Sequence, residues 1–325
     1  MKRVLLSSVI AAIAAAVALV SGPVVAAGKA PGCRTAKLIV PWKAGGGTHI
    51  IFSIFEKTIL NMDVPSKIKV VTVPGQGGNK GAKEAAKAKP DGCTLFAIHQ
   101  SAVTSYLNGR VDFHFDGFDM VANLTSTPDI VGASANVPWN NFAEMQKAIL
   151  AAPGTVNVGA TFGSTSQFYW LILEEQTGMK FKFVPYDGTR ERMTALLSGA
   201  VQLGGLNVAS GRKYIESGEL KAFAIASAKR SKHFPDMPTL KELGVDMIYA
   251  LDRGIVAPKG TDKAVIEYWS QVFKQAAEDK DLLAQMDSKG TDVNWVGPDG
   301  YRKWADKTFA DHEKVAIKIG MWKQQ

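Results

Sequence analysis

The sequence predicts an α/β fold in which strands alternate with helices and pair mostly in parallel. Three observations carry this prediction. Short apolar runs recur along the chain, segments with apolar residues at helical spacing follow most of them, and glycine- or proline-rich turns separate the two. A length of 325 residues allows two lobes with separate cores, because single cores stop growing near about 250–300 residues.

The elements follow in chain order, separated by turns such as "PGQGGNKG" and "KPDG". A long connection, "AKRSKHFPDMPTLKELGVDM", occupies residues 228–247. Strands are expected over 37–40, 68–73, 94–98, 120–125, 130–135, within 152–160, and over 181–185, 202–206, 222–227 and 254–257. Helices are expected over 50–60, 82–87, 142–151, 166–176, 190–198, 212–217, 262–277 and 298–319.

The N-terminal residues 1–27 have the pattern of a secretory signal peptide. Lys2 and Arg3 precede the apolar stretch 4–20, and the segment 24–27 ends in small residues. An uncleaved membrane anchor is the alternative, but the small residues before Gly28 favour cleavage after Ala26 or Ala27. We therefore expect an exported, soluble mature chain.

Charge and cysteine content narrow the function classes. Removing Lys2 and Arg3 leaves 36 basic residues against 30 acidic residues, a net charge of +6. The lysines are scattered without aromatic interleaving, which argues against a nucleic-acid partner and suits a small anionic ligand or a solvated surface. Cys33 and Cys93 are the two cysteines, and in an oxidising compartment they predict one disulfide; two buried thiols are the alternative.

Two glycine- or hydroxyl-rich turns stand between a strand and a helix. In "PWKAGGGTHI" the glycines let the backbone approach a ligand, and the N–H groups of the next helix can point at an anion. It is neither a P-loop nor a dinucleotide fingerprint, and a structural turn explains it equally well. "VNVGATFGSTSQFYW" repeats the pattern, with Ser164, Thr165 and Ser166 either capping the helix or donating to an anion. Two such helix starts favour a ligand held between two lobes.

Five segments in this order resemble one protein family. They are "KLIVPWKAGGGTHI", "VPGQGGNKGAKEAAKAKPDGCTL", "VPYDGTRERMTALLSGAVQL", "SGELKAFAIASAKRSKHFPDMPTLKELG" and "RGIVAPKGTD". Together they are similar to the Bug-type extracytoplasmic solute receptors of tripartite tricarboxylate transporters. The resemblance covers essentially the whole mature chain.

The resemblance implies a type II periplasmic-binding-protein fold, in which two α/β lobes joined by crossing strands close on a ligand in the cleft. One lobe is expected to comprise residues 28–126 and 251–325, and the other residues 127–250. The resemblance also implies a periplasmic location, a small carboxylate ligand, delivery to the membrane subunits of a tripartite transporter, and no cofactor. We expect the receptor to act as a monomer.

The family's ligand-contacting positions map onto particular residues here. Backbone N–H groups of the two turns would hold one carboxylate, with aromatic and aliphatic side chains between the lobes. Many relatives carry aspartate at the position of His49, which suits ligands with an amino group. Histidine supplies no fixed negative charge, so we do not expect a cationic group on the ligand of this protein. Phe168 replaces a frequent histidine and indicates either a flat ligand or, as we favour, a core position. The implied ligand-binding residues are Trp42, Gly45, Gly46, Gly47, Thr48, His49, Ser164, Thr165, Ser166, Tyr186, Gly188, Asn207 and Arg253.

Arg253 is the candidate for holding a second carboxylate. It stands where the chain is expected to cross back between the lobes, and a guanidinium matches a carboxylate in bidentate fashion. A surface salt bridge with Asp252 or another acid is the alternative.

Catalytic and metal-binding patterns are weak in this sequence. No G-x-S-x-G elbow and no HExxH motif occurs. His99 ends a strand and is open to a role in the cleft, in capping or in solvent, while Asp112, His114 and Asp116 suit a solvated strand edge better than a metal site. We therefore predict a non-catalytic receptor for a di- or tricarboxylate, aromatic ones included. The alternatives are a receptor that presents its ligand to a membrane sensor and, from another class, a secreted hydrolase.

Overall fold

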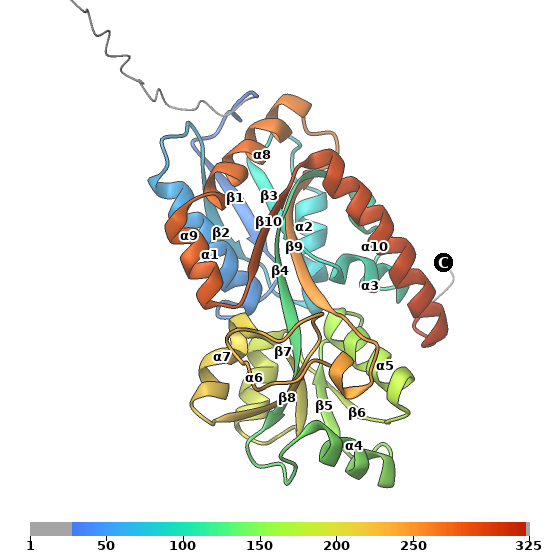
Figure 1. Cartoon of the computed structure of the whole chain (residues 1–325). Coiled ribbons are helices and arrows are strands. Elements are labelled where there is room, and N and C mark those ends of the chain that lie inside the picture. The colour runs from blue at the N-terminus through green and yellow to red at the C-terminus, as the bar shows by residue number, and fades with distance from the viewer. Residues whose placement is uncertain (1–27, 323–325) are drawn as a thin grey trace, which may run out of the picture.

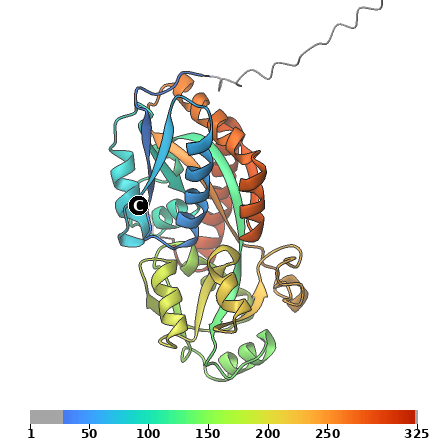
Figure 2. The same ribbon diagram turned by 90° about the vertical axis from the view of Figure 1, so that its left-hand side faces the viewer.

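The protein consists of two α/β lobes, one above the other in Figures 1 and 2. The structure is a computed structural model and describes residues 28–322, so the expected signal peptide lies outside the described residues. Within the described range, no helix is long and apolar enough to cross a membrane. The two-lobe fold that the sequence predicted is confirmed.

The first lobe is built on the parallel strands β1 (Thr35–Val40), β2 (Lys67–Thr72) and β3 (Thr94–Ile98). Helix α1 (Gly47–Asn61) follows β1 directly through the glycine turn. Its other elements are α2 (Asn79–Ala86), α3 (Ser101–Leu107), α8 (Lys263–Ala277), α9 (Lys280–Ser288), β10 (Asp292–Val296) and α10 (Pro298–Lys318).

The second lobe repeats this plan with β5 (Asn157–Ala160) parallel to both β6 (Lys182–Pro185) and β7 (Leu203–Asn207). Strand β8 (Leu220–Ile225) pairs with the crossing strand described next. The helices of this lobe are α4 (Phe142–Ala151), α5 (Thr165–Thr177), α6 (Thr189–Leu197) and α7 (Val208–Glu216).

Two long strands connect the lobes. β4 (Phe118–Ser134) pairs antiparallel with β9 (Ala250–Pro258) and then with β7, so one strand belongs to both lobes (Figure 1). The expectation of mostly parallel pairing therefore holds only for β2-β1-β3 and β6-β5-β7, because every pair made by β4 or β9 is antiparallel. The predicted lobe boundaries, 126/127 and 250/251, fall inside β4 and at the start of β9.

The strands expected over 120–125 and 130–135 are parts of one continuous strand, β4, which runs through Pro128. Pro128 lies opposite Ala250, at the last position paired with β9, and the pairing with β7 begins at Asp129. A proline interrupts fewer ladder hydrogen bonds where one partner strand gives way to another. Helices α3 and α9 and strand β10 were not predicted, and two of these three are shorter than eight residues.

The predicted disulfide is confirmed. Cys33 and Cys93 are bonded, with their Cα atoms 5.9 Å apart. The bond joins the segment before β1 to the residue before β3. Phe168 is 1% exposed and its ring stacks on His312, with centroids 4.9 Å apart, so the core interpretation of Phe168 is the correct one.

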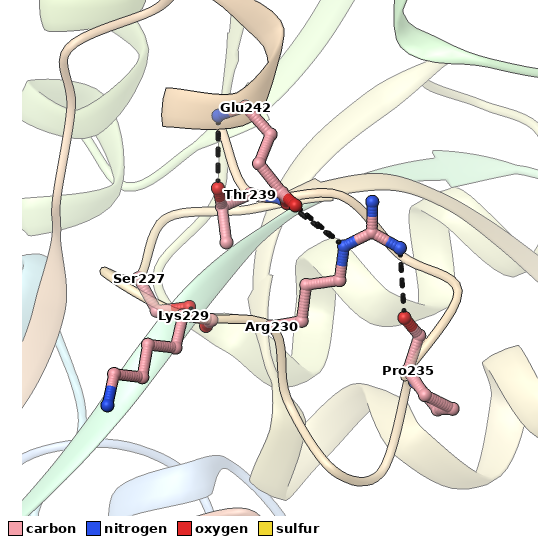
Figure 3. A network of polar contacts seen from close by, with 6 residues as sticks. All are labelled: Ser227, Lys229, Arg230, Pro235, Thr239 and Glu242. Atoms are coloured by element: carbon pink, nitrogen blue, oxygen red, sulfur yellow. Dashed lines mark hydrogen bonds and ion pairs between the residues drawn. The ribbon is translucent and has the colours of Figure 1, made fainter.

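The long connection between β8 and β9 is held by its own polar contacts (Figure 3). The Nε of Arg230 lies 3.0 Å from both carboxylate oxygens of Glu242, and Arg230 Nη1 donates to the carbonyl of Pro235 at 3.1 Å. Thr239 and Glu242 exchange hydrogen bonds between side chain and backbone, the reciprocal pattern of a capping box. These contacts fix the path by which the chain returns to β9.

Candidate functional site

A cavity of about 40 Å³ lies between the lobes, at the carboxyl ends of the parallel strands. Ligands of open α/β sheets bind at such ends. Both lobes and both crossing strands contribute to it. The lining residues are Trp42, Lys43, Gly46, Gly47, Thr48, His99, Asp129, Thr161, Ser164, Thr165, Ser166, Tyr169, Gly188, Thr189, Arg190, Glu191, Arg192, Gly205, Asn207, Leu251 and Arg253.

Three helices begin at this cavity without a side-chain cap. The N-cap residues of α1, α5 and α6 are Gly46, Ser164 and Gly188, and none of them makes a side-chain capping hydrogen bond. The first N–H groups of a helix have no partner within the helix and carry partial positive charge. The side chain of Asn207 does cap α7, accepting from the N–H of Ser210 at 3.1 Å. The uncapped helix starts therefore make the cavity suited to an anion.

Arg253 is completely buried at the cavity wall, so the surface salt-bridge interpretation is wrong. Its Nε donates to the Thr48 hydroxyl at 3.1 Å and its Nη1 to the Thr127 hydroxyl at 2.7 Å. Nη2 has no hydrogen-bond partner among the described residues. Neutral acceptors thus orient the guanidinium and leave one of its nitrogens for a ligand.

Arg192 is a second buried arginine, contributed by α6 of the other lobe, and sequence reasoning missed it. It is 5% exposed; its Nη1 donates to Thr161 at 2.7 Å and its Nη2 to Thr189 at 3.1 Å. Its Nε has no partner among the residues that the structure describes. Arg192 shares a helical face with buried Leu196, four residues on, and that spacing was the available signal.

Asp129, on β4 where the strand passes between the lobes, was also missed. It is 6% exposed and lines the cavity. Burial raises its pKa to about 7, against the opposing effect of the charges on Arg253 and Arg192. Its place in the stretch 120–134 of β4, where the other residues are mostly apolar or carry a hydroxyl group, was the sequence signal for it.

Ten of the thirteen predicted ligand-binding residues line the cavity. They are Trp42, Gly46, Gly47, Thr48, Ser164, Thr165, Ser166, Gly188, Asn207 and Arg253. Gly45, His49 and Tyr186 do not line it. His49 Nδ1 accepts from the Gly45 N–H at 3.4 Å, and Tyr186 packs beside Gly159 and the apolar cluster around Leu196.

His99 both lines the cavity and caps a helix, two roles that the sequence left open. Its Nδ1 accepts from the N–H of Ser101, the first residue of α3, at 3.1 Å. Burial, reinforced by the charge of Arg253, lowers the pKa of His99 well below its usual value. The imidazole is therefore neutral at pH 7.

The rim of the cavity is closed by contacts between the lobes. Arg190 Nη1 donates to the carbonyl of Ala44 at 2.7 Å, and Lys43 pairs with Glu191 at 2.6 Å. At the adjoining edge the Asp187 carboxylate accepts from the N–H of Gly77 at 2.6 Å. These contacts join the two lobes at the rim and have to break when the lobes separate.

Known proteins are similar to this chain over most of its length. The sequence model of the family described as "Tripartite tricarboxylate transporter family receptor" matches residues 65–321 of this chain. The "UPF0065 protein in gbd 5'region" of Cupriavidus necator is 28% identical over 325 residues, which cover 97% of each chain. Protein BugT of Bordetella pertussis is 27% identical over 83% of this chain and 84% of its own.

Solved structures agree with the sequence comparisons. The structure of the periplasmic binding protein BugD superimposes with a TM-score of 0.83 at 25% identity, covering 90% of this chain and 99% of that one. The family match begins just before β2 and ends just after α10, so it includes most of the cavity lining but not the glycine turn before α1. This chain belongs to the family of tripartite tricarboxylate transporter receptors.

Proposed function

We propose that this protein is a non-catalytic periplasmic receptor that captures a small organic carboxylate and delivers it to the membrane subunits of a tripartite transporter. The ligand is a di- or tricarboxylate, aromatic acids included. Capture proceeds by closure of the two lobes, and the closed form is the one that docks on the membrane subunits. The receptor works as a monomer.

The observation that carries this proposal is the pair of buried arginines on opposite lobes. Arg253 and Arg192 each keep one nitrogen without a partner among residues 28–322, and both line the cavity where three uncapped helices begin. Asp129 acts on both guanidinium groups electrostatically, but the unpartnered nitrogen of each is still a buried donor, which costs about 1–3 kcal/mol or more unless a ligand anion accepts from it. A ligand with two carboxylates supplies two such anions, one for each lobe.

Closure gives this arrangement its mechanism. The helix starts of α1 and α5 belong to different lobes, so a carboxylate that contacts both is bound only when the lobes meet. A ligand shifts an open–closed equilibrium by the difference between its affinities for the two states. Contacts completed only in the closed state therefore convert ligand binding into closure.

A two-step experiment tests the proposal. A thermal-shift screen of the mature chain against aliphatic and aromatic mono-, di- and tricarboxylates comes first; a ligand at a hundredfold excess over its Kd stabilises the fold by about 2.7 kcal/mol. Small-angle scattering with and without the best acid then measures closure. The proposal is supported if a dicarboxylate binds and the radius of gyration of the protein decreases when it does. Failure of every acid to bind contradicts the proposal. Ligand-dependent association with the membrane subunits of the transporter, in detergent, separates transport from sensing.

A further inference from the structure

The cavity holds an unpaired acceptor as well as unpaired donors. No ion pair of Asp129 within 4.0 Å is found among residues 28–322, although Arg253 and Arg192 both act on it electrostatically. Its carboxylate has no hydrogen-bond donor in the described chain either. Three donors of the lining likewise have no hydrogen-bond partner among the described residues. They are the Tyr169 hydroxyl, Arg253 Nη2 and Arg192 Nε.

The backbone fixes Asp129 in this position. Its N–H donates to the carbonyl of Tyr249 at 3.1 Å, and its own carbonyl accepts from the N–H of Ala226 at 2.8 Å. Its Cα is in register with Asn207, another lining residue. The backbone of Asp129 is thus fixed between the residue before β9 and the residue after β8, with its side chain buried at the cavity.

A plain dicarboxylate does not complement this set of groups. Its anionic ends satisfy the arginines and the helix starts, but nothing on it donates to Asp129, and its charges repel that carboxylate. Leaving a buried acceptor without a hydrogen-bond donor costs about 1–3 kcal/mol, and more when the group is charged. A ligand that also carries a hydroxyl or ammonium group removes this cost, because either group donates a hydrogen bond to the carboxylate.

We propose that Asp129 is a specificity-determining residue, and that it selects carboxylates bearing a hydrogen-bond donor, a hydroxyl or an ammonium group, over the unsubstituted acids. This inference rests on the proposed function and names the ligand class of the same cavity.

The test compares matched acids by isothermal titration calorimetry on the mature chain at about pH 8.5, where Asp129, with a pKa of about 7, is ionised. Succinate is titrated beside malate and aspartate, glutarate beside 2-hydroxyglutarate and glutamate, and isophthalate beside 5-hydroxyisophthalate. In each set that binds, we expect the donor-bearing acid to bind at least tenfold more tightly than its unsubstituted parent. Comparing the affinities for aspartate and glutamate with those for the matching hydroxy acids shows whether the protein prefers an ammonium or a hydroxyl donor.

The Asp129→Asn variant is expected to gain affinity for some acids, and a misfolded protein would lose affinity instead. Removing the charge removes the repulsion, so an unsubstituted parent acid is expected to bind at least fivefold more tightly to Asp129→Asn than to the wild type. Binding of the ammonium acids is expected to weaken at least tenfold, because their ion pair is lost. Asp63→Asn is the matched control, since Asp63 is exposed in the turn after α1, and all of its affinities should equal those of the wild type.

The outcomes separate this inference from the proposed function. If no acid binds the wild type, the proposed function fails and the inference fails with it. If parent acids bind as tightly as their substituted forms, or if Asp129→Asn binds them no better than the wild type does, the receptor function stands and the role of Asp129 is overturned.

Discussion

The rings of Trp42 and His99 are stacked, with centroids 4.3 Å apart and planes inclined by 7°. Both residues line the cavity, and both are less than a tenth exposed. Because the His99 Nδ1 accepts a hydrogen bond, the proton of its neutral ring lies on Nε2. The pair forms a flat, uncharged wall beside the glycine turn, in a cavity whose other walls are strongly polar.

Loss of this wall is expected to weaken binding. Trp42→Ala should reduce the affinity for the best acid of the screen by about two- to tenfold, corresponding to the roughly 0.5–1.5 kcal/mol of an aromatic pair. Trp42→Phe keeps a ring over His99 and should stay within about twofold of the wild type. Calorimetric titration of both variants is the measurement, and equal affinities of Trp42→Ala and wild type would show that the wall only fills space.

Arg253 provides a sharper test of the anion site. Arg253→Ala is expected to weaken binding by about 2–5 kcal/mol, the usual effect of removing one partner of a buried charge pair. Arg253→Lys should also bind poorly, because one ammonium group cannot reach Thr48, Thr127 and a ligand together. Arg34→Ala, at an exposed arginine of the same lobe, is the control. Wild-type affinity in both Arg253 variants would exclude a ligand contact.

The glycine turn can be tested at Gly47. A Cβ there would lie 3.1 Å from the Asn207 side-chain amide and 3.2 Å from Arg253 Nη2. Gly47→Val is therefore expected to displace both groups and to lower the affinity at least tenfold in calorimetry, with the circular dichroism spectrum unchanged. A Cβ at Gly32 would meet nothing within 4 Å, so Gly32→Ala should bind like the wild type. Undiminished affinity of Gly47→Val would mean that the turn is merely structural.

The sequence predicted the elements and the helix starts of the site well because these depend on local patterns. Strand β3 has the predicted ends, and the Gly46 and Ser164 turns lie where strand–turn–helix order placed them. The continuity of β4 across Pro128 was not predictable, because it depends on which strands lie beside it.

The charged centre of the site was largely invisible in the sequence for the same reason. Arg253 was recognised from the expected chain crossing, but Arg192 and Asp129 become site residues only when the lobes meet. A charged residue on a helix or in an extended segment is usually solvated, and only tertiary contacts show otherwise. Their burial at 5% and 6% exposure is therefore a finding of the structure.

The disulfide is expected to contribute stability without affecting the site. The bridge between Cys33 and Cys93 closes a loop with a sequence separation of 60, for which the chain-entropy model gives about 4 kcal/mol. The Cys33→Ala/Cys93→Ala double variant should lose about 2–5 kcal/mol of unfolding free energy in urea titrations and keep its ligand affinity, because neither residue lines the cavity. An unchanged urea midpoint would contradict the prediction.

His312 is expected to make the protein sensitive to mild acid. Its ring packs on Phe168, and burial lowers its pKa from 6.5 to about 4. Between these values the unfolded chain binds a proton that the folded chain does not, so stability falls as the pH decreases through 6.5 and levels off near 4. From pH 7 to pH 5 this residue should cost about 2 kcal/mol, at roughly 1.36 kcal/mol per pKa unit.

The variant that isolates this effect is His312→Phe, which keeps a ring against Phe168 and cannot titrate. Urea unfolding of both proteins at pH 7 and pH 5 gives two losses of free energy. The other histidines contribute equally to both proteins, and any packing difference at residue 312 is present at both pH values, so both cancel in the comparison. We expect the loss in His312→Phe to be smaller by about 2 kcal/mol. Equal losses would mean that His312 is protonated in the folded protein at pH 5 and would contradict a pKa lowered to about 4 by burial.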